Sequence, residues 1–429
     1  MKYKLQEEKN MSKIVKLAIL GAGARGRCYA AFARQFPDRL QIAAVAEPDD
    51  YYREKVAREY NVAPENCFRS WEDFVKKEKM CDAVAICTQD NMHEAPAIAC
   101  AELGYHILLE KPMAPTPEAC KRIVEAVKKA NVMFAVCHVL RYTAYTKVLK
   151  EIIKSGEIGD IVSIQHLEPV GYWHQAHSFV RGFWRNEAES SFMLLAKSCH
   201  DVDWLRGVMD KKCVAVQSFG SLRHFRASEK PEGAADRCCD CPVRIESNCP
   251  YSANKIYFRD RLCKGTKCWP VNVLTPDPTP ETLEKALAEG PYGRCVYACD
   301  NDVVDNQVVN MSFIDGSTAS MTMTAFNFCG GRKTRIFGTK GEIDTDSTII
   351  TIKNFLTDTI RTVDTDQLND GGINSGHGGG DTGIMHNFVQ AVAEDDPSLI
   401  LTGIDETLES HLMVFAAEKS RRENIVCTL

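Results

Sequence analysis

A strand that leads directly into a glycine-rich turn and a helix is the feature that most constrains the fold of this chain. The apolar run 14–20 is long enough for one buried strand, and 27–36 has the composition of a helix. Between them lies Gly21-x-Gly23-x-x-Gly26. In this context the first glycine permits a tight turn, the second lets a pyrophosphate approach the backbone, and the third lets the helix pack on the strand. The diphosphate would bind N–H groups of the first helical turn, so Ala24 and Arg25 are also predicted to contact the cofactor.

The second predicted strand supports this interpretation. It covers 41–46 and is followed by Glu47. An acidic side chain there accepts hydrogen bonds from the adenosine ribose and repels a 2′-phosphate, which favours NAD over NADP. The alternative is a structural glycine turn beside a solvated glutamate. We predict an NAD site.

Length and composition indicate a soluble protein of two domains. The chain has 429 residues, 45% hydrophobic and 26% charged, with a net charge of −6. This charge argues against a nucleic-acid partner, and no apolar run approaches the roughly 18 residues of a membrane span. Residues 1–13 are expected to form a loose tail without a signal peptide. The nineteen cysteines therefore suggest reduced thiols in a cytoplasmic protein.

Residues 14–137 are predicted to form a doubly wound parallel sheet of the Rossmann type. Apolar strands at 82–87, 106–109 and 132–136 alternate with helices, which is typical of α/β folds. Ligands bind beyond the carboxyl ends of such strands. The segments 88–93 (Thr-Gln-Asp-Asn-Met-His) and 110–112 (Glu-Lys-Pro) both lie at that edge.

The glycine turn, the Thr-x-x-Asn-x-His segment and the Glu-Lys-Pro segment together resemble the glucose–fructose oxidoreductase / inositol dehydrogenase (Gfo/Idh/MocA) family. The resemblance covers nearly the whole chain. It implies that Lys111 reaches the junction of nicotinamide and substrate. It also implies that Pro112, after a cis or a trans bond, fixes the loop. The cofactor-binding residues would then include Thr88, Asn91, His93, Glu110, Lys111 and Pro112.

Lys111 has a chemical role consistent with this place. A lysine beside a sugar hydroxyl stabilises a developing alkoxide and holds a nearby base in its proton-accepting state. The alternative is an ordinary surface lysine at the end of a strand.

Residues 138–429 are predicted to form an α+β domain for substrate binding and oligomerisation. Strands at 212–221, 303–313, 317–325, 332–337 and 348–352 predict a large, mostly antiparallel sheet. A final helix, 405–421, would pack back onto the first domain. In the resembled family the open face of this sheet often forms the homo-oligomer interface, so a homo-oligomer is expected.

Two loops of the second half have the composition of a sugar site. Aromatic faces pack on the C–H faces of sugars, and Arg or His supplies hydroxyl contacts. The candidate substrate-binding residues of the first loop are Tyr172, Trp173, His174, His177, Arg181 and Trp184. The alternative is an aromatic satellite core. In the glycine-rich loop 375–381, His377 is a candidate substrate clamp, and the alternative is a plain flexible loop.

The segment 191–204 is predicted to be one helix with Lys197, His200 and Asp201 on one face. In the resembled family a helix here carries the catalytic histidine, and His200 matches that position. Many members place an aspartate four residues earlier, where this chain has Ala196, so a Lys–His variant is favoured. His200 would take the hydroxyl proton as hydride leaves, Lys197 would assist, and Asp201 would contact substrate. The alternative is a structural histidine.

A cysteine-rich insertion, 226–300, is not needed by the basic fold. Cys238 and Cys241 have the C-x2-C spacing of a chelating pair, and Cys249 with a fourth group would complete a structural zinc site. An iron–sulfur cluster and free or packed thiols are the alternatives.

The leading hypothesis is an NAD-dependent oxidoreductase acting on a secondary hydroxyl of a sugar, glycoside or cyclitol. The first alternative keeps the site but retains NAD, so that a transient keto-sugar permits redox-neutral glycoside cleavage or elimination. The second is a non-catalytic NAD or thiol sensor. The sequence does not identify the sugar, the hydroxyl or the number of subunits.

Overall fold

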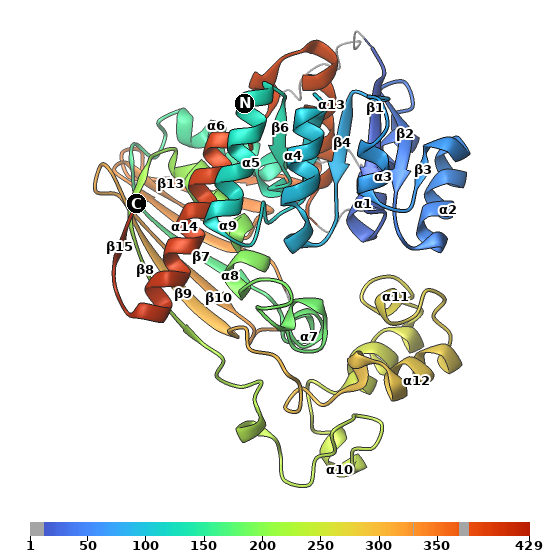
Figure 1. Ribbon diagram of the computed structural model, residues 1–429. Helices are drawn as coiled ribbons and strands as arrows, with labels where there is room; N and C mark the ends of the chain where they lie inside the picture. The colour runs from blue at the N-terminus through green and yellow to red at the C-terminus, as the bar shows by residue number, and fades with distance from the viewer. Residues whose placement is uncertain (1–12, 329, 369–376) are drawn as a thin grey trace.

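The computed structural model describes residues 13–328, 330–368 and 377–429. They form two sheets and a separate insertion (Figure 1). The predicted tail, 1–13, lies outside the described residues except for Lys13, whose Nζ pairs with Asp82 at 3.0 Å. Part of the predicted glycine-rich loop, 375–376, also lies outside them.

The first sheet is the doubly wound parallel sheet that the sequence predicts. Its six strands are ordered β3-β2-β1-β4-β5-β6, and all neighbours run parallel. Every residue of β4 is buried, as expected for a strand covered on both faces. The strands are β1 (Val15–Leu20), β2 (Leu40–Ala46), β3 (Cys67–Phe68), β4 (Ala83–Ile86), β5 (His106–Leu109) and β6 (Phe134–Val136). The helices between them are α1 (Ala24–Gln35), α2 (Asp50–Tyr60), α3 (Trp71–Val75), α4 (Glu94–Glu102) and α5 (Pro117–Ala130).

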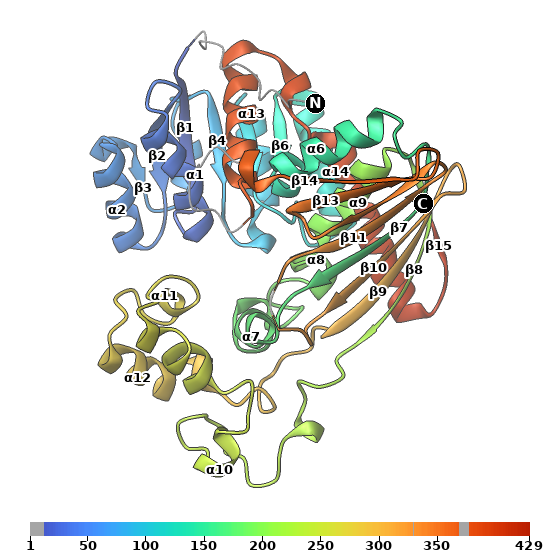
Figure 2. The same cartoon turned by 180° about the vertical axis from the view of Figure 1, so that it is seen from behind.

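Two helices from the end of the chain complete the covering of this sheet (Figure 2). Helix α13 (Gly380–Glu394) packs with α1 against one face, where Ile384, Met385 and Phe388 join the core. Helix α14 (Ile404–Glu423) packs against α5 on the other face, where Leu408 and Phe415 contact that core. The late part of the sequence therefore stabilises the first sheet directly.

The second sheet is mixed and mostly antiparallel. Its nine strands are ordered β14-β13-β12-β11-β7-β10-β9-β8-β15. Strands β7 and β10 run parallel, and the other neighbours run antiparallel. The strands are β7 (Ile161–Pro169), β8 (Cys213–Ser221), β9 (Asn306–Phe313), β10 (Thr318–Thr324), β11 (Lys333–Gly338), β12 (Gly341–Thr345), β13 (Ile349–Asn354), β14 (Thr359–Asp364) and β15 (Cys427–Thr428). The sequence missed β12, β14 and β15, which are short or largely polar.

One face of the second sheet is covered by helices. Helix α6 (Ala144–Lys154), α8 (Met193–Ala196), α9 (Cys199–Met209) and α14 share one hydrophobic core with the inward residues of the strands. The loop with the predicted aromatic substrate-binding residues, 172–184, is called the aromatic segment below. It begins with the short helix α7 (Tyr172–His174), which leads into a π-helix, Gln175–Arg181. No described helix is long and apolar enough to cross a membrane.

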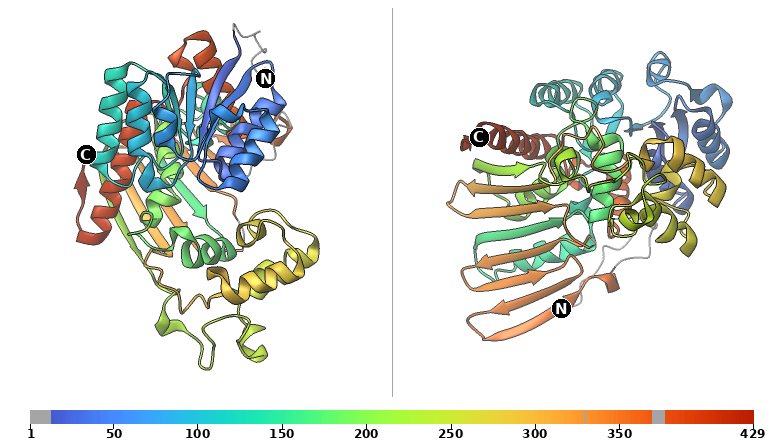
Figure 3. Two further views of the ribbon diagram at one scale, coloured as in Figure 1. Left: turned by 45° about the vertical axis from the view of Figure 1, so that its right-hand side comes forward. Right: turned by 90° about the horizontal axis from the view of Figure 1, so that it is seen from below.

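The insertion lies between β8 and β9 and stands apart from both sheets (Figure 3). It contains α10 (Val243–Glu246), a π-helix (Asn254–Arg259), α11 (Val271–Leu274) and α12 (Pro280–Glu289). It has its own hydrophobic core, to which Ala176 and Val180 of the aromatic segment also belong. The described cysteines are all free thiols.

Candidate functional site

The glycine turn between β1 and α1 has the close contacts that the sequence predicts. Gly21 has a φ of +92°, and a Cβ on it would lie 2.6 Å from the carbonyl oxygen of Cys87. A Cβ on Gly26 would lie 2.0 Å from the carbonyl oxygen of Gly21. A Cβ on Gly23 would meet nothing within 4 Å. Gly21 and Gly26 therefore allow close packing of the backbone, whereas Gly23 leaves open space beside it.

The start of α1 suits a dinucleotide diphosphate. No side chain caps the helix, and its first turn contains no acidic residue, so its N-terminal N–H groups and dipole favour an anion. Glu47 lies beside the turn, where its carboxylate accepts hydrogen bonds from Ala22 N at 2.6 Å and Asp49 N at 3.0 Å. An ionised carboxylate has lone pairs for further donors. These residues fit NAD.

The glycines allow a matched pair of variants. We expect Gly26→Ala to destabilise the protein by about 2 kcal/mol, because its methyl group would overlap backbone. Gly23→Ala should keep the wild-type melting temperature but weaken NAD binding, since its methyl group fills the open space. Thermal denaturation and NAD titration measure the two effects. Equal destabilisation by both variants would contradict the assignment.

Arg25 and Glu110, both predicted to bind cofactor, contact each other. Arg25 Nε lies 2.6 Å from Glu110 Oε1, and Arg25 Nη2 lies 2.5 Å from Asp381 Oδ1. Tyr29 donates its hydroxyl proton to Glu110 at 2.5 Å. Burial raises the pKa of Glu110, but Arg25 and Lys111 together hold it below its usual value. This ion-pair network joins α1, the end of β5 and α13.

The loops after β4 and β5 are joined by His93. Its Nδ1 lies 2.8 Å from Pro112 O and its Nε2 lies 3.1 Å from Thr88 O. His93 is 1% exposed, and the Lys111–Pro112 bond is cis. His93 therefore positions both loops, whereas Asn91 is exposed at the surface.

Lys111 reaches from the first sheet into the second half of the chain. Its Nζ donates to Ala196 O at 2.8 Å, at the end of α8. The buried Asp90 also lies near it, and burial raises the pKa of this carboxyl group. The sequence analysis did not single out Asp90, although it lies within the segment 88–93. The predicted junction residue thus lies between the two sheets.

The prediction of one helix over 191–204 is wrong. Helix α8 ends at Ala196 and α9 begins at Cys199, because Ser198 has non-helical dihedral angles (φ −101°, ψ 9°). Lys197 therefore does not share a helix face with His200. Its Nζ pairs with Glu168 at the end of β7 instead, at 2.9 Å.

His200 lies in the first turn of α9 and is buried. Its ring centroid lies 5.6 Å from that of His138 and 5.8 Å from that of His377. Its Nδ1 has no hydrogen-bond partner in the described part of the chain. Burial, and then the charge of Lys111, lower its pKa well below the usual value. His200 is therefore a neutral imidazole under the influence of Lys111.

Asp201 and Asp203 have structural partners. Asp201 accepts from Arg332 Nε at 2.5 Å and lies 3.0 Å from His166 Nε2. Asp203 accepts two hydrogen bonds from the buried Arg141, at 2.7 and 2.9 Å. Asp201, predicted to contact substrate, is instead fully enclosed in this ion-pair network.

The sequence analysis missed three residues of this network. They are His166, Glu168 and Arg332, and Arg332 Nε also pairs with Glu168 at 3.0 Å. His166 and Glu168 lie at the end of β7, and Arg332 immediately precedes β11. Polar residues at the adjoining ends of predicted strands are a signal that could have found them, once the pairing of β7 with β11 was known.

The aromatic segment divides between two environments. Trp173 stacks on His174 with ring centroids 5.6 Å apart, and burial, followed by the charge of Lys197, lowers the pKa of His174. His177 instead lies 2.9 Å from the hydroxyl of Tyr257 in the insertion.

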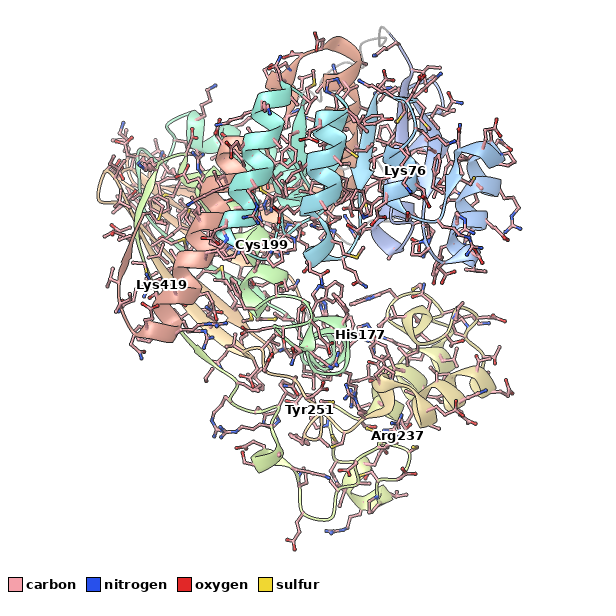
Figure 4. All side chains as sticks on the ribbon, in the orientation of Figure 1. Lys76, His177, Cys199, Arg237, Tyr251 and Lys419 are labelled. Carbon is pink, nitrogen blue, oxygen red and sulfur yellow. The ribbon has the colours of Figure 1, made fainter. Side chains whose placement is uncertain are left out.

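The remaining predicted residues of this segment also contact the insertion or other aromatic rings. Arg181 donates to the Tyr251 carbonyl at 2.7 Å, and the Tyr172 hydroxyl accepts from Lys255 Nζ at 3.2 Å. Trp184 is 36% exposed and contacts Phe179 and Phe183. Figure 4 labels His177 where this segment meets the insertion. His177 and Arg181 thus pack as a satellite core, the alternative that the sequence left open.

His377 lies beside His200, as a substrate clamp would require. Its Nδ1 is 3.1 Å from Asp381 Oδ2. Burial opposes ionisation of Asp381, but His377 and Arg25 hold its pKa below the usual value. His377 also lines a pocket together with His166, Trp204 and Arg332.

The predicted zinc site is not formed. No group of three or more His, Cys, Asp or Glu side chains among the described residues could hold a metal ion. Cys238, Cys241 and Cys249 are all described, and they line a cavity rather than converge on one point. Spacing along the chain alone therefore gave an incorrect ligand geometry.

Comparison with known proteins agrees with the two-part fold of this chain. The family model described as "Oxidoreductase family, NAD-binding Rossmann fold" (GFO_IDH_MocA) matches residues 15–138. A second model, "Oxidoreductase family, C-terminal alpha/beta domain", matches residues 150–429. In structure, levoglucosan dehydrogenase in complex with NADH is 19% identical with a TM-score of 0.70, over 97% of this chain and 99% of that chain.

Among curated relatives, 2,7-anhydro-N-acetylneuraminate hydratase of Escherichia coli is 27% identical over 49% of this chain and 54% of its own length. Myo-inositol 2-dehydrogenase of Thermotoga maritima is 24% identical over 48% of this chain and 59% of its own length. The chain spans about half the length of the curated relatives it matches. Since the two family models together cover both sheets, the chain belongs to the Gfo/Idh/MocA oxidoreductase family.

Proposed function

We propose that this protein oxidises a secondary hydroxyl group of a sugar, glycoside or cyclitol, with NAD as hydride acceptor. The observation that carries the proposal is the contact of Lys111 Nζ with Ala196 O at 2.8 Å, in the segment that leads to the buried His200. Burial, and then the charge of Lys111, lower the pKa of that histidine. Lys111 follows the carboxyl end of β5, and His200 lies in α9, which packs against the second sheet. The names of relatives, myo-inositol 2-dehydrogenase and levoglucosan dehydrogenase, support the substrate class.

In the proposed mechanism His200 removes the hydroxyl proton. A neutral imidazole has one unprotonated ring nitrogen, which can accept it. Lys111 stabilises the negative charge that develops on the substrate oxygen. Ala196 O and the His93-bound loop hold the lysine in place. NAD supplies the carbon that accepts the hydride.

Lys197, His174 and His377 are proposed to bind other hydroxyl groups of the substrate. Lys197 is held by Glu168, and His377 is held by Asp381. Both are thus oriented donors of limited mobility, which lowers the entropic cost of binding. A homo-oligomer through the open face of the second sheet remains part of this proposal.

A panel of monosaccharides, glycosides and cyclitols, incubated with NAD or NADP, tests the function. We expect substrate-dependent NADH absorbance together with a product that has lost two hydrogen atoms. The kcat/KM measured with NAD should exceed that with NADP by roughly 100-fold, because the carboxylate of Glu47 would repel a 2′-phosphate. Turnover with NADP alone would contradict the role of Glu47. No NADH formation with any member of the panel would contradict net oxidation.

A redox-neutral reaction is the second candidate, and one observation favours it. The Escherichia coli relative is named a hydratase, a name that describes no net oxidation. Oxidising a ring hydroxyl acidifies the neighbouring C–H, so His200 could serve a transient oxidation followed by elimination. Cleavage of a glycoside substrate without accumulation of NADH would favour this candidate over net oxidation.

A further inference from the structure

Four cysteines of the insertion line one cavity. Cys238, Cys241, Cys249 and Cys295 line it together with Arg181. The isolated bridge between Arg237 and Arg294 brings the distant chain segments together. Cys238 N donates to Gly293 O at 2.9 Å and Cys295 N donates to Asp236 O at 2.8 Å. Backbone pairing thus places the last cysteine beside the first three.

Arg181 is a buried cation that lines this cavity, and Glu246, the carboxylate that also lines it, pairs with Arg259 and Ser252 instead. It is 1% exposed and donates to two backbone carbonyls, Tyr251 O and Arg294 O, both at 2.7 Å. Its Nη2 lies 3.6 Å from Cys238 Sγ, and its Nη1 has no partner among the described residues. A buried charge without a counter-charge is costly. An anionic group in the cavity would offset this cost.

A metal–thiolate cluster supplies this negative charge. A single zinc ion needs all of its sulfur ligands about 2.3 Å away, and no group of the described residues is placed to hold one ion. In an iron–sulfur cluster each cysteine binds a different iron atom, so the sulfurs surround the cluster instead of converging on one point. Four cysteines that line one cavity are compatible with that arrangement.

We propose that Cys238, Cys241, Cys249 and Cys295 bind a 4Fe–4S cluster. Cys238 Sγ accepts a hydrogen bond from Ala253 N at 3.3 Å in addition to the one from Arg181. Such N–H···S bonds stabilise and tune iron–sulfur clusters. The guanidinium of Arg181 offsets the net negative charge of the cluster and its thiolates.

The cluster would hold the insertion against the aromatic segment. Arg181 ends the π-helix that begins just after His174. Trp269 of the insertion contacts His174 with ring centroids 5.1 Å apart, and Arg261 lies over the ring of Trp173. Figure 4 labels Tyr251 and Arg237 within the insertion, next to this segment. The cluster thus has a positioning role for residues proposed to bind substrate.

Anaerobic purification and reconstitution of the full chain with ferrous iron and sulfide test the cluster. We expect about four iron and four acid-labile sulfide ions per chain, a broad visible absorbance, and an electron paramagnetic resonance signal after reduction. Cys238→Ala and Cys295→Ala should each lose most of the iron. Cys239→Ala is the matched control, because Cys239 is exposed and does not line the cavity. It should keep wild-type iron and sulfide.

Three outcomes would overturn the proposal. They are zinc without sulfide, iron that stays in Cys238→Ala and Cys295→Ala, and four thiols that remain titratable in wild-type protein after reconstitution. Cys241→Ala is a second test if the other variants do not fold, because Cys241 is only partly buried. These metal measurements do not depend on the proposed dehydrogenase activity, so either proposal can fail alone.

Discussion

Replacing His200 by alanine should lower kcat by about 100- to 10,000-fold, the usual range for removing a general base. The substrate proton would then have no acceptor beside Lys111. NAD affinity should stay within about twofold of wild type, since the glycine turn is unchanged. His200→Asn, which retains a polar side chain of similar length, should show the same loss. Steady-state kinetics on the substrate found in the panel, with NAD titration, provides the measurement.

His106→Gln is the matched control for this variant. His106 lies at the amino end of β5, whereas Lys111 follows its carboxyl end. Its only assigned role is structural, since its Nδ1 accepts from Met133 N at 3.0 Å. This control should keep wild-type kcat. A His200→Ala enzyme with kcat within a few-fold of wild type would show that another group removes the proton.

Replacing Lys111 by methionine should lower kcat by about 100- to 1,000-fold, the range for losing one group that stabilises developing oxyanion charge. It should also change the pH profile. The charge of Lys111 lowers the pKa of His200, so its removal should raise that pKa towards its usual value of about 6.5. His200 would then become protonated at higher pH. The acidic limb of kcat/KM should accordingly move to higher pH in Lys111→Met than in wild type.

Two further variants separate charge from structure. Lys111→Arg retains the positive charge and should leave the acidic limb near its wild-type position, although it loses activity through geometry. Lys197→Met should mainly raise KM, because Lys197 pairs with Glu168 rather than sharing a helix face with His200. An acidic limb that stays in place in Lys111→Met would contradict the electrostatic coupling.

Local sequence patterns were sufficient to predict the first sheet except for the two-residue strand β3. A buried strand, a glycine turn and a helix are each specified by residues close together in the chain, and their repetition leaves few topologies. The carboxyl-edge segments 88–93 and 110–112 could be found for the same reason, since parallel strands end at a common edge. The antiparallel sheet was predicted less completely, because the short strand β12 and the exposed strand β14 provide little hydrophobic signal.

The candidate catalytic site was predictable only in part. Lys111 and His200 were found from motif position, and in the structure burial and the charge of Lys111 lower the pKa of His200. Glu168, Arg332 and His166 were missed because the partners of a polar residue on a strand cannot be predicted until the neighbouring strand is known. The shared helix face of Lys197 and His200 was predicted wrongly because helical spacing was applied across Ser198, where the backbone leaves the helix.

Sequence by itself determined which residues can do chemistry, together with the NAD-type turn and the two-sheet architecture. Tertiary structure decided which of these residues meet. In the folded chain Arg181 and His177 contact the insertion, and Asp201 lies between Arg332 and His166. Four cysteines from separate parts of the insertion line one cavity. The physical reason is that hydrogen bonds within strands and helices follow local spacing, whereas ion pairs and cavities join segments that only the packed chain brings together.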